Sequence, residues 1–160
     1  MEKLIAQLKR HEGFRAMPYR CTAGYLTIGY GRNIDNVPLS TDEWRVIKAN
    51  SLDELVSKGI AEPEAESLLI LEVQRLHKVL GQKIKWFAEL DEVRQAVLIN
   101  MAFNLGVTGL LKFKNTLTLI RDKAYIKAGH AMLKSLWASQ VKGRADELAL
   151  QMQTGKWRQS

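Results

Sequence analysis

The sequence contains one cysteine, so no disulfide can form within its 160 residues. Nothing in its cysteine usage therefore indicates an oxidising compartment. The longest purely aliphatic run, Leu68 to Leu71, is far shorter than the ~20 apolar residues that span a bilayer. The N-terminus carries charges at positions 2, 3, 9 and 10 and lacks the apolar core of a signal peptide. We therefore expect a chain without a signal peptide or transmembrane segment that is made in the cytosol and stays soluble.

Clustered metal ligands and blocks of basic residues are also missing. His11, His77 and His130 stand far apart, and no pair of them has a ligand spacing on one helix, so we expect neither a metal site nor a cofactor. No run of five cations and no zinc-finger or RNA-binding motif occurs, so nucleic acid is not an expected partner. The net charge of +7 favours other polyanions, such as a bacterial envelope, although it also suits solubility alone.

Hydrophobic residues make up 46% of the chain, which is typical of a globular protein. Its length fits one domain, or two lobes that share a core. Apolar periodicity predicts helices over about 2–11, from 63 to about 80, and over 91–105, 124–138 and 144–153, with Gly106 ending the one that begins at Asp91. A capping box, Ser40-x-x-Glu43, predicts a helix start at about 41, and Leu52, Leu55 and Val56 continue a short helix that Gly59 can stop. Between the first two helices, β-forming residues and glycines over 18–31 predict a hairpin that turns at Thr22-Ala23-Gly24.

Three residues of this first region bear groups suited to catalysis: Glu12, Cys21 and Thr27. Glu12 lies at the C-terminal end of a predicted helix, where a carboxylate is electrostatically unfavourable, as acids in catalytic sites often are. A free cysteine is most often a small buried hydrophobe, and an isolated threonine is an ordinary strand residue. Only their spacing, Glu-x8-Cys-x5-Thr, favours a site over these simpler interpretations.

The segments HEGFRAMPYRCTAGYLTIGYG, residues 11–31, and NMAFNLGVTGLLKFKNTL, residues 100–117, resemble the phage-type lysozymes, or endolysins. In that family a glutamate ends the first helix, and a threonine lies on the strand after a hairpin. The hairpin carries an aspartate or, in some members, a cysteine, which is Cys21 here. The resemblance implies an α+β, lysozyme-like fold that is mainly helical, with a small sheet lobe and a helical bundle. The whole chain, residues 1–160, would be one lysozyme domain: small lobe about 13–60, connecting helix about 62–80, and helical lobe about 81–160 together with the N-terminal helix 2–11.

The resemblance also implies a muramidase that cuts the β-1,4 bond between N-acetylmuramic acid and N-acetylglucosamine. Glu12 would be the general acid, Cys21 a nucleophile or a water-activating base, and Thr27 would position the water. A separation of ~6.5–9.5 Å between the two groups would give inversion and ~5–5.5 Å retention, and the family pattern favours inversion. Asp35 is the next candidate for the second group. Residues expected to line the sugar-binding cleft are Phe103, Asn104, Thr116, Gln140 and Arg144, the last reaching toward the acid.

The expected partner is peptidoglycan, with a membrane-permeabilising holin giving access to it, and the expected state is a monomer. The chain would wait in the host cytoplasm and act on the wall in the periplasm after release. The alternative is a catalytically weak protein that binds glycan or envelope on the same fold.

Overall fold

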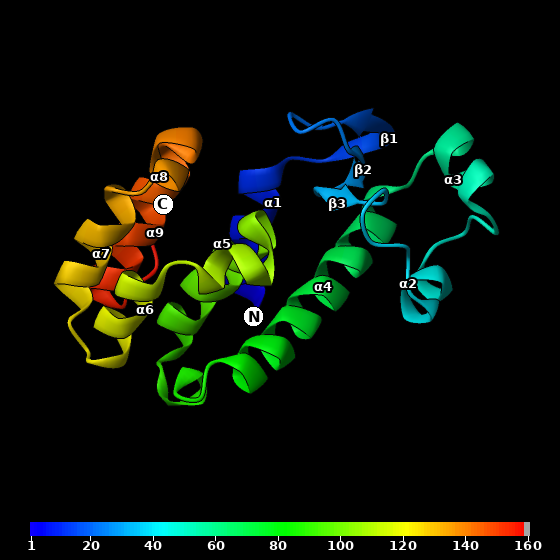
Figure 1. The fold of residues 1–160 in the computed structure, drawn as a ribbon. Helices are drawn as coiled ribbons and strands as arrows, with labels where there is room; N and C mark the ends of the chain where they lie inside the picture. Colours follow the sequence, from blue (N-terminus) through cyan, green and yellow to red (C-terminus); the bar gives the residue numbers. More distant parts are fainter. Residues whose placement is uncertain (159–160) are drawn as a thin grey trace. The chain divides into compact units, whose positions relative to one another are not determined.

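The computed structural model describes residues 1–158 and divides the chain into two compact units. The first is Met1–Arg75 and the second begins at Leu76, so the boundary falls within the long helix α4 (Glu62–Lys83) in Figure 1. The helical lobe was predicted to reach residue 160, and its last two positions lie outside the described residues. The architecture is α+β, as predicted: many helices and one small antiparallel sheet.

The sheet of the first unit has three strands in the order β1–β2–β3. In the β1–β2 ladder, Tyr19 lies directly opposite Thr27. The predicted turn is confirmed, because the N–H of Gly24 donates to the carbonyl of Cys21 at 2.8 Å. The elements of this unit before α4 are α1 (Glu2–Glu12), β1 (Arg15–Arg20), β2 (Leu26–Gly29), β3 (Arg32–Asn33), α2 (Thr41–Val46) and α3 (Leu52–Lys58).

Two close approaches hold the sheet against its neighbours in this unit. A Cβ added at Gly29 would lie 3.1 Å from the Cβ of Ala65, so β2 packs directly on α4. On the other strand, the carbonyl of Ala16 accepts a hydrogen bond from the N–H of Ile60 at 2.8 Å, just after α3 ends at Gly59. These contacts fix the hairpin that carries the candidate site residues.

Within its described residues, the second unit contains helices joined by short turns and no strand. The helix predicted over 91–105 is confirmed as the buried part of α5, and Gly106, with φ 78°, interrupts α5 where its end was predicted. α7 packs on α6 and α9. After α4 the elements are the short 3₁₀ helix η1 (Phe87–Glu89), α5 (Glu92–Leu111), α6 (Lys114–Arg121), α7 (Tyr125–Leu133), α8 (Leu136–Val141) and α9 (Gly143–Thr154).

The prediction of one helix over 124–138 is wrong. The backbone of Ser135 is extended, and its hydroxyl accepts a hydrogen bond from the N–H of Ala138 at 3.2 Å, so a new helix, α8, begins there. Serine is a strong N-cap, and here the cap outweighed the continuing apolar pattern. The helix α6 was not predicted, because its eight residues have no side-chain cap at Phe113 to mark their start.

Within residues 1–158, no single helix has both the length and the apolar composition needed to cross a bilayer. The pair α5 and α6 meets those criteria only when taken together, across a bend of 102°.

The carboxylate of Glu43 anchors the predicted capping box at the start of α2. It accepts hydrogen bonds from Arg32 Nε at 2.7 Å and Nη2 at 2.8 Å, and from the N–H of Ser40 at 3.0 Å. Glu43 is 8% exposed. Burial alone would raise the pKa of Glu43, but the hydrogen bonds from Arg32 and Ser40 outweigh it and hold that pKa below its usual value.

We expect Glu43→Gln to lower the free energy of unfolding at pH 7 by about 2 kcal/mol, the scale of a charge-assisted hydrogen-bond pair. Because the folded-state pKa is lowered, the carboxylate stabilises the fold above its unfolded pKa of ~4.3, and this contribution is lost as the pH falls through the folded pKa. The difference between the variant and the wild type should therefore shrink in acid. Urea unfolding at several pH values measures it.

Asp42→Asn is the matched control on the same helical turn. Asp42 pairs with Arg45 at 3.2 Å, but both side chains are 73% exposed, so the pair should contribute almost nothing. Equal destabilisation by the two substitutions would contradict the role given to Glu43.

Candidate active site

Glu12 is the last residue of α1, and its carboxyl group lies against the turn between β2 and β3. The helix ends at Gly13, whose φ of 72° lies in the positive range that glycine adopts without strain. A Cβ added at Gly31 would stand 2.7 Å from Glu12 Oε2 and 3.0 Å from Cδ. The backbone of Gly31 therefore forms one wall of the space that holds the carboxyl group, and a side chain at this position would force the carboxyl group to shift.

Cys21 opens the tight turn of the β1–β2 hairpin, with its side chain half-buried. Its N–H donates to the carbonyl of Tyr25 at 2.9 Å. The amide of Tyr25 is the main cause that lowers the pKa of the Cys21 thiol below its ordinary value. The amides of Ala23 and Gly24 and the hydroxyl of Thr27 act in the same direction, against the opposing effect of burial. A turn of backbone N–H groups thus favours the thiolate without help from a cationic side chain.

Thr27 is 3% exposed, and its hydroxyl lies within reach of two acceptors. It donates to the carbonyl of Tyr25 at 2.9 Å, and it is also placed to donate to the Cys21 sulfur. One hydroxyl has one proton, so these two bonds are alternatives. When Cys21 ionises, the proton can turn from the carbonyl to the thiolate, because a charge-assisted bond is the stronger one.

Tyr19 lies within electrostatic range of both Glu12 and Cys21. It stands opposite Thr27 in the ladder, which places both side chains on one face of the sheet. Burial raises the pKa of Tyr19, and the negative charges of Glu12 and Cys21 raise it further, against the guanidinium of Arg15, which lies 4.5 Å over the ring. Tyr19 is therefore within electrostatic reach of both groups. Cys21 and Thr27 are within hydrogen-bonding reach of each other, and Glu12 and Cys21 both act electrostatically on Tyr19.

Asp35 has a structural role at the far edge of the same hairpin. Its Oδ2 accepts the N–H of Leu26 at 2.7 Å and pairs with Arg20 Nη1 at 3.3 Å. Arg20 also donates to the carbonyl of Gly24 at 2.9 Å. Both side chains thus brace the turn.

The turn at Gly31 is braced from the other side by Tyr30. The Tyr30 hydroxyl donates to Glu62 Oε1 at 2.8 Å, and Lys9 Nζ lies 3.1 Å from the same oxygen and 2.8 Å from Glu66. Lys9 is one turn before Glu12 on α1. The network ties α1, the β2–β3 turn and α4 together within the first unit.

The remaining predicted residues lie in the second unit. Asn104 and Phe103 come just before the break in α5, and Asn104 Oδ1 accepts the indole N–H of Trp137 at 2.7 Å. Arg144, in the first turn of α9, donates from Nε and Nη2 to Asn100 Oδ1 at 3.0 and 2.8 Å. The structure thus holds two of these polar groups in place.

Thr116 and Gln140 complete the predicted substrate-binding set. Thr116 is 4% exposed on α6, whereas Gln140 is exposed on α8. That all five residues serve the same substrate as Glu12, Cys21 and Thr27 stays a prediction.

Comparison with known proteins gives a family. The profile of the phage lysozymes matches residues 9–151. The chain belongs to the phage lysozyme family. It is 30% identical over 159 residues to the probable T4-type lysozyme 1 of Dictyostelium discoideum, and the aligned region covers 92% of each chain. It is 34% identical over 161 residues to the pre-baseplate central spike protein Gp5 of Enterobacteria phage T4, covering 95% of this chain and 28% of that protein. An endolysin of Acyrthosiphon pisum secondary endosymbiont phage 1 is 27% identical over 107 residues, covering 67% of this chain and 60% of that one.

The family makes this lysozyme an enzyme, a glycoside hydrolase with peptidoglycan as its substrate. Sequence reasoning missed Tyr19, Tyr30 and Gly31 as neighbours of the candidate site residues. Strand alternation could have found Tyr19, which is two residues before Cys21. The close approach of Gly31 to the carboxyl group depends on the tertiary fold and left no such signal.

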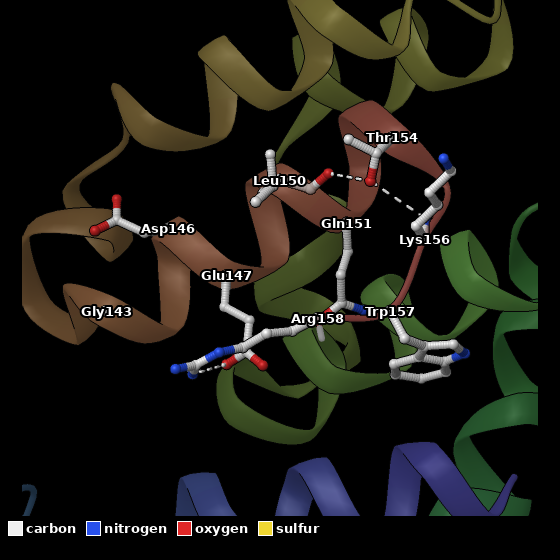
Figure 2. Close-up of a pocket in the computed structure, with 9 residues that line it drawn as sticks. All are labelled: Gly143, Asp146, Glu147, Leu150, Gln151, Thr154, Lys156, Trp157 and Arg158. Carbon is white, nitrogen blue, oxygen red and sulfur yellow. Dashed lines mark hydrogen bonds and ion pairs between the residues drawn. The ribbon is translucent and has the colours of Figure 1, made fainter. Parts of the chain in front are cut away.

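Neither a metal cluster nor the cavity in Figure 2 adds to the lysozyme site. Among residues 1–158, no group of three or more His, Cys, Asp or Glu side chains is placed to hold a metal ion. The cavity, of about 570 Å³, runs along one face of α9 between Gly143 and Thr154 and under the segment Lys156 to Arg158. None of the eight predicted site residues lines it.

We expect Gly31→Ala to reduce lysozyme turnover at least ~10-fold, because the added methyl group must displace the Glu12 carboxyl and small displacements of catalytic groups are costly. Gly106→Ala is the control for backbone strain. Its φ of 78° matches the 72° of Gly31, but an added Cβ there meets nothing within 4 Å. Both variants should lose ~1–3 kcal/mol of stability, and only Gly31→Ala should lose most of its turnover of purified peptidoglycan. If Gly31→Ala turns over peptidoglycan at the wild-type rate, activity does not depend on the position that the Gly31 backbone gives the Glu12 carboxyl group.

Proposed function

We propose that this lysozyme hydrolyses the β-1,4 bond between N-acetylmuramic acid and N-acetylglucosamine through Glu12, Cys21 and Thr27. One observation supports this most: a thiol with a lowered pKa and a buried hydroxyl share the face of a hairpin, and a carboxyl group lies against the adjoining turn. Glycoside hydrolysis needs one proton donor and one group that activates water or attacks the sugar. The three side chains supply these functions.

Glu12 is the general acid. Its protonated carboxyl gives its proton to the glycosidic oxygen as the bond from that oxygen to the anomeric carbon breaks. The wall formed by Gly31 and the bracing through Tyr30, Glu62 and Lys9 favour one position of the carboxyl, which general acid catalysis needs.

Cys21 supplies the second group. As a thiolate it takes a proton from a water molecule whose oxygen attacks the anomeric carbon, and Thr27 orients that water. The thiol formed then loses its proton to solvent and Glu12 regains one, so the enzyme is restored. In the alternative course the sulfur itself attacks and forms a glycosyl thioether that water must hydrolyse. The first course inverts the anomeric configuration and the second retains it, so proton NMR of the first-formed sugar distinguishes them.

Five residues of the second unit bind the glycan in this proposal. The backbone at Phe103 and the side chains of Asn104, Thr116 and Gln140 contact sugar, and Arg144 acts near the acid. The fixed orientations of Asn104 by Trp137 and of Arg144 by Asn100 support preorganised hydrogen bonds to a polar ligand.

The proposed setting is phage lysis from inside a bacterium, with the chain as a monomeric endolysin. The similarity to an endolysin supports it. Such a protein is made in the host cytoplasm and reaches the wall when a holin permeabilises the inner membrane. The single lysozyme domain keeps its proposed bounds, with a small lobe at 13–60, a connecting helix at 62–80 and a helical lobe over the remainder with the first helix.

Glu12→Gln tests the acid and the setting together. The amide cannot donate the proton, so release of reducing ends from purified peptidoglycan should fall at least ~10²-fold while the protein stays folded. Cells expressing the wild type should lyse only after their inner membrane is permeabilised, and cells expressing Glu12→Gln should not lyse. Near-wild-type reducing-end release by the variant would contradict the assignment of Glu12 as the general acid. A wild type that binds peptidoglycan without releasing reducing ends would favour a binding protein instead.

Substitutions at Cys21 test the second group. Cys21→Asp should keep measurable activity, because a carboxylate can also activate water, whereas Cys21→Ser should lose most activity, because a hydroxyl does not ionise near neutral pH. Wild-type activity should rise with pH as the thiolate forms, at a pKa below ~8.5, and the Asp variant should stay active to lower pH because carboxylates ionise near ~3.9. Rates of reducing-end release across pH give both profiles.

Alkylation of the lone thiol is the control for these variants. Inactivation of the wild type should follow the extent of modification, and Cys21→Asp should resist the reagent. Full activity in a folded Cys21→Ser variant would mean that the cysteine only packs, and that another group activates the water.

A further inference from the structure

The positive charge of the chain resides in its second unit. From Met1 to Arg75 there are 10 Lys and Arg against 11 Asp and Glu, a net charge of −1. From Leu76 onward there are 14 against 6, a net charge of +8. Such an asymmetry means that an anionic surface would attract the second unit and not the first.

Ten of the fourteen cations in the second unit are lysines, and all ten are exposed. Over residues 76–158, no side-chain carboxylate lies within ion-pair distance of any of them, whereas the arginines at 94, 121 and 158 do have acidic partners. The lysine charges are therefore directed to solvent and remain available to an external anion.

Part of this basic unit also exposes aliphatic side chains. Ile126 on α7 is 57% exposed, Leu133 at the end of α7 is 41% exposed, and Leu136 at the start of α8 is 74% exposed. Ile126 and Leu133 are seven residues apart and so lie on one face of α7. The buried residues of α7 are Ala128, Gly129 and Met132, and a Cβ added at Gly129 would collide with Gln153 of α9. The aliphatic row lies beside this buried side of the helix, and its side chains reach solvent.

Lysines border this aliphatic face. Lys127 follows Ile126, and Lys134 lies seven residues further on, so the two form a basic row on α7 beside the aliphatic one. Lys123 is an exposed turn residue two positions before the helix begins, and it lies close to Lys127 along the chain. We call these six side chains, at 123, 126, 127, 133, 134 and 136, the α7–α8 surface. α7 and α8 are in contact within the second unit (Figure 1).

We propose that the α7–α8 surface binds an anionic phospholipid bilayer. An anionic headgroup layer complements the lysines, and the hydrocarbon beneath it accepts the three aliphatic side chains. A fully hydrated polyanion such as the wall would attract the lysines but gain little from Ile126, Leu133 and Leu136. The combination of both kinds of group on one helix face is what favours lipid.

Vesicle co-sedimentation of the full chain tests the proposal. The wild type should bind vesicles of phosphatidylglycerol and phosphatidylethanolamine at low salt, and not vesicles of phosphatidylcholine. The aliphatic triple variant, Ile126→Ser, Leu133→Ser and Leu136→Ser, should bind the anionic vesicles at least ~10-fold more weakly, because the apolar insertion is lost. Circular dichroism should show an unchanged fold, since the three side chains are exposed.

The control is a matched triple in the first unit. Val37, Leu52 and Val56 are 61%, 48% and 37% exposed, and serine at these positions removes similar apolar surface from the unit with net charge −1. This control should bind the anionic vesicles as the wild type does. Glu12→Gln should also bind as the wild type does, so that failure of the catalytic proposal and failure of this one are distinguishable.

A second pair of variants tests the lysines. The triple variant Lys123→Gln, Lys127→Gln, Lys134→Gln should abolish most vesicle binding. The triple variant Lys78→Gln, Lys83→Gln, Lys85→Gln removes the same charge elsewhere in the second unit and should weaken binding only slightly. Unchanged binding by the aliphatic triple, or wild-type binding to purified wall with none to anionic vesicles, would overturn the proposal and assign the basic surface to a polyanion.

Discussion

The approach of the Glu12 carboxyl group to the backbone of Gly31 is the constraint on which the site depends. A helix C-terminus repels a carboxylate, and a turn without a side chain leaves room for the carboxyl group of Glu12 in its present position. The turn must also be held in place, and Tyr30 does so through Glu62, which Lys9 binds from the same helix that ends at Glu12. Helix end and turn are thus fixed to a common partner, so the distance between them varies little.

The proposed mechanism uses Cys21 where the family pattern commonly has an aspartate, and this changes how its second group must be ionised. A carboxylate is charged at neutral pH wherever it is hydrated, but a thiol needs stabilisation of its thiolate. Here that stabilisation comes from hydrogen-bond donors of the tight turn, chiefly the amide of Tyr25, and from Thr27. Arg20 is next to Cys21 in sequence but is engaged with Asp35 and Gly24. The hairpin conformation itself therefore prepares the sulfur.

Local signals explain what the sequence predicted and what it did not. The capping box at Ser40, the stop at Gly59 and the break at Gly106 each depend on a few neighbouring residues, and all three are confirmed. The division at Ser135 was missed because apolar periodicity continues through it while a side-chain cap ends the helix. The wall at Gly31 was missed for another reason. Its glycine has a positive φ and looks like an ordinary turn residue until the fold brings Glu12 beside it.

The net positive charge lies in the second unit, whereas the hairpin that carries Cys21 lies in the first. Long-range attraction between exposed charges is screened beyond ~8 Å at physiological ionic strength, whereas hydrogen bonds to the sulfur act at contact and are screened little. The thiolate of Cys21 is favoured chiefly by such contacts. The binding proposed for the lysines can therefore vary with salt, while the hydrogen bonds that favour the thiolate change little.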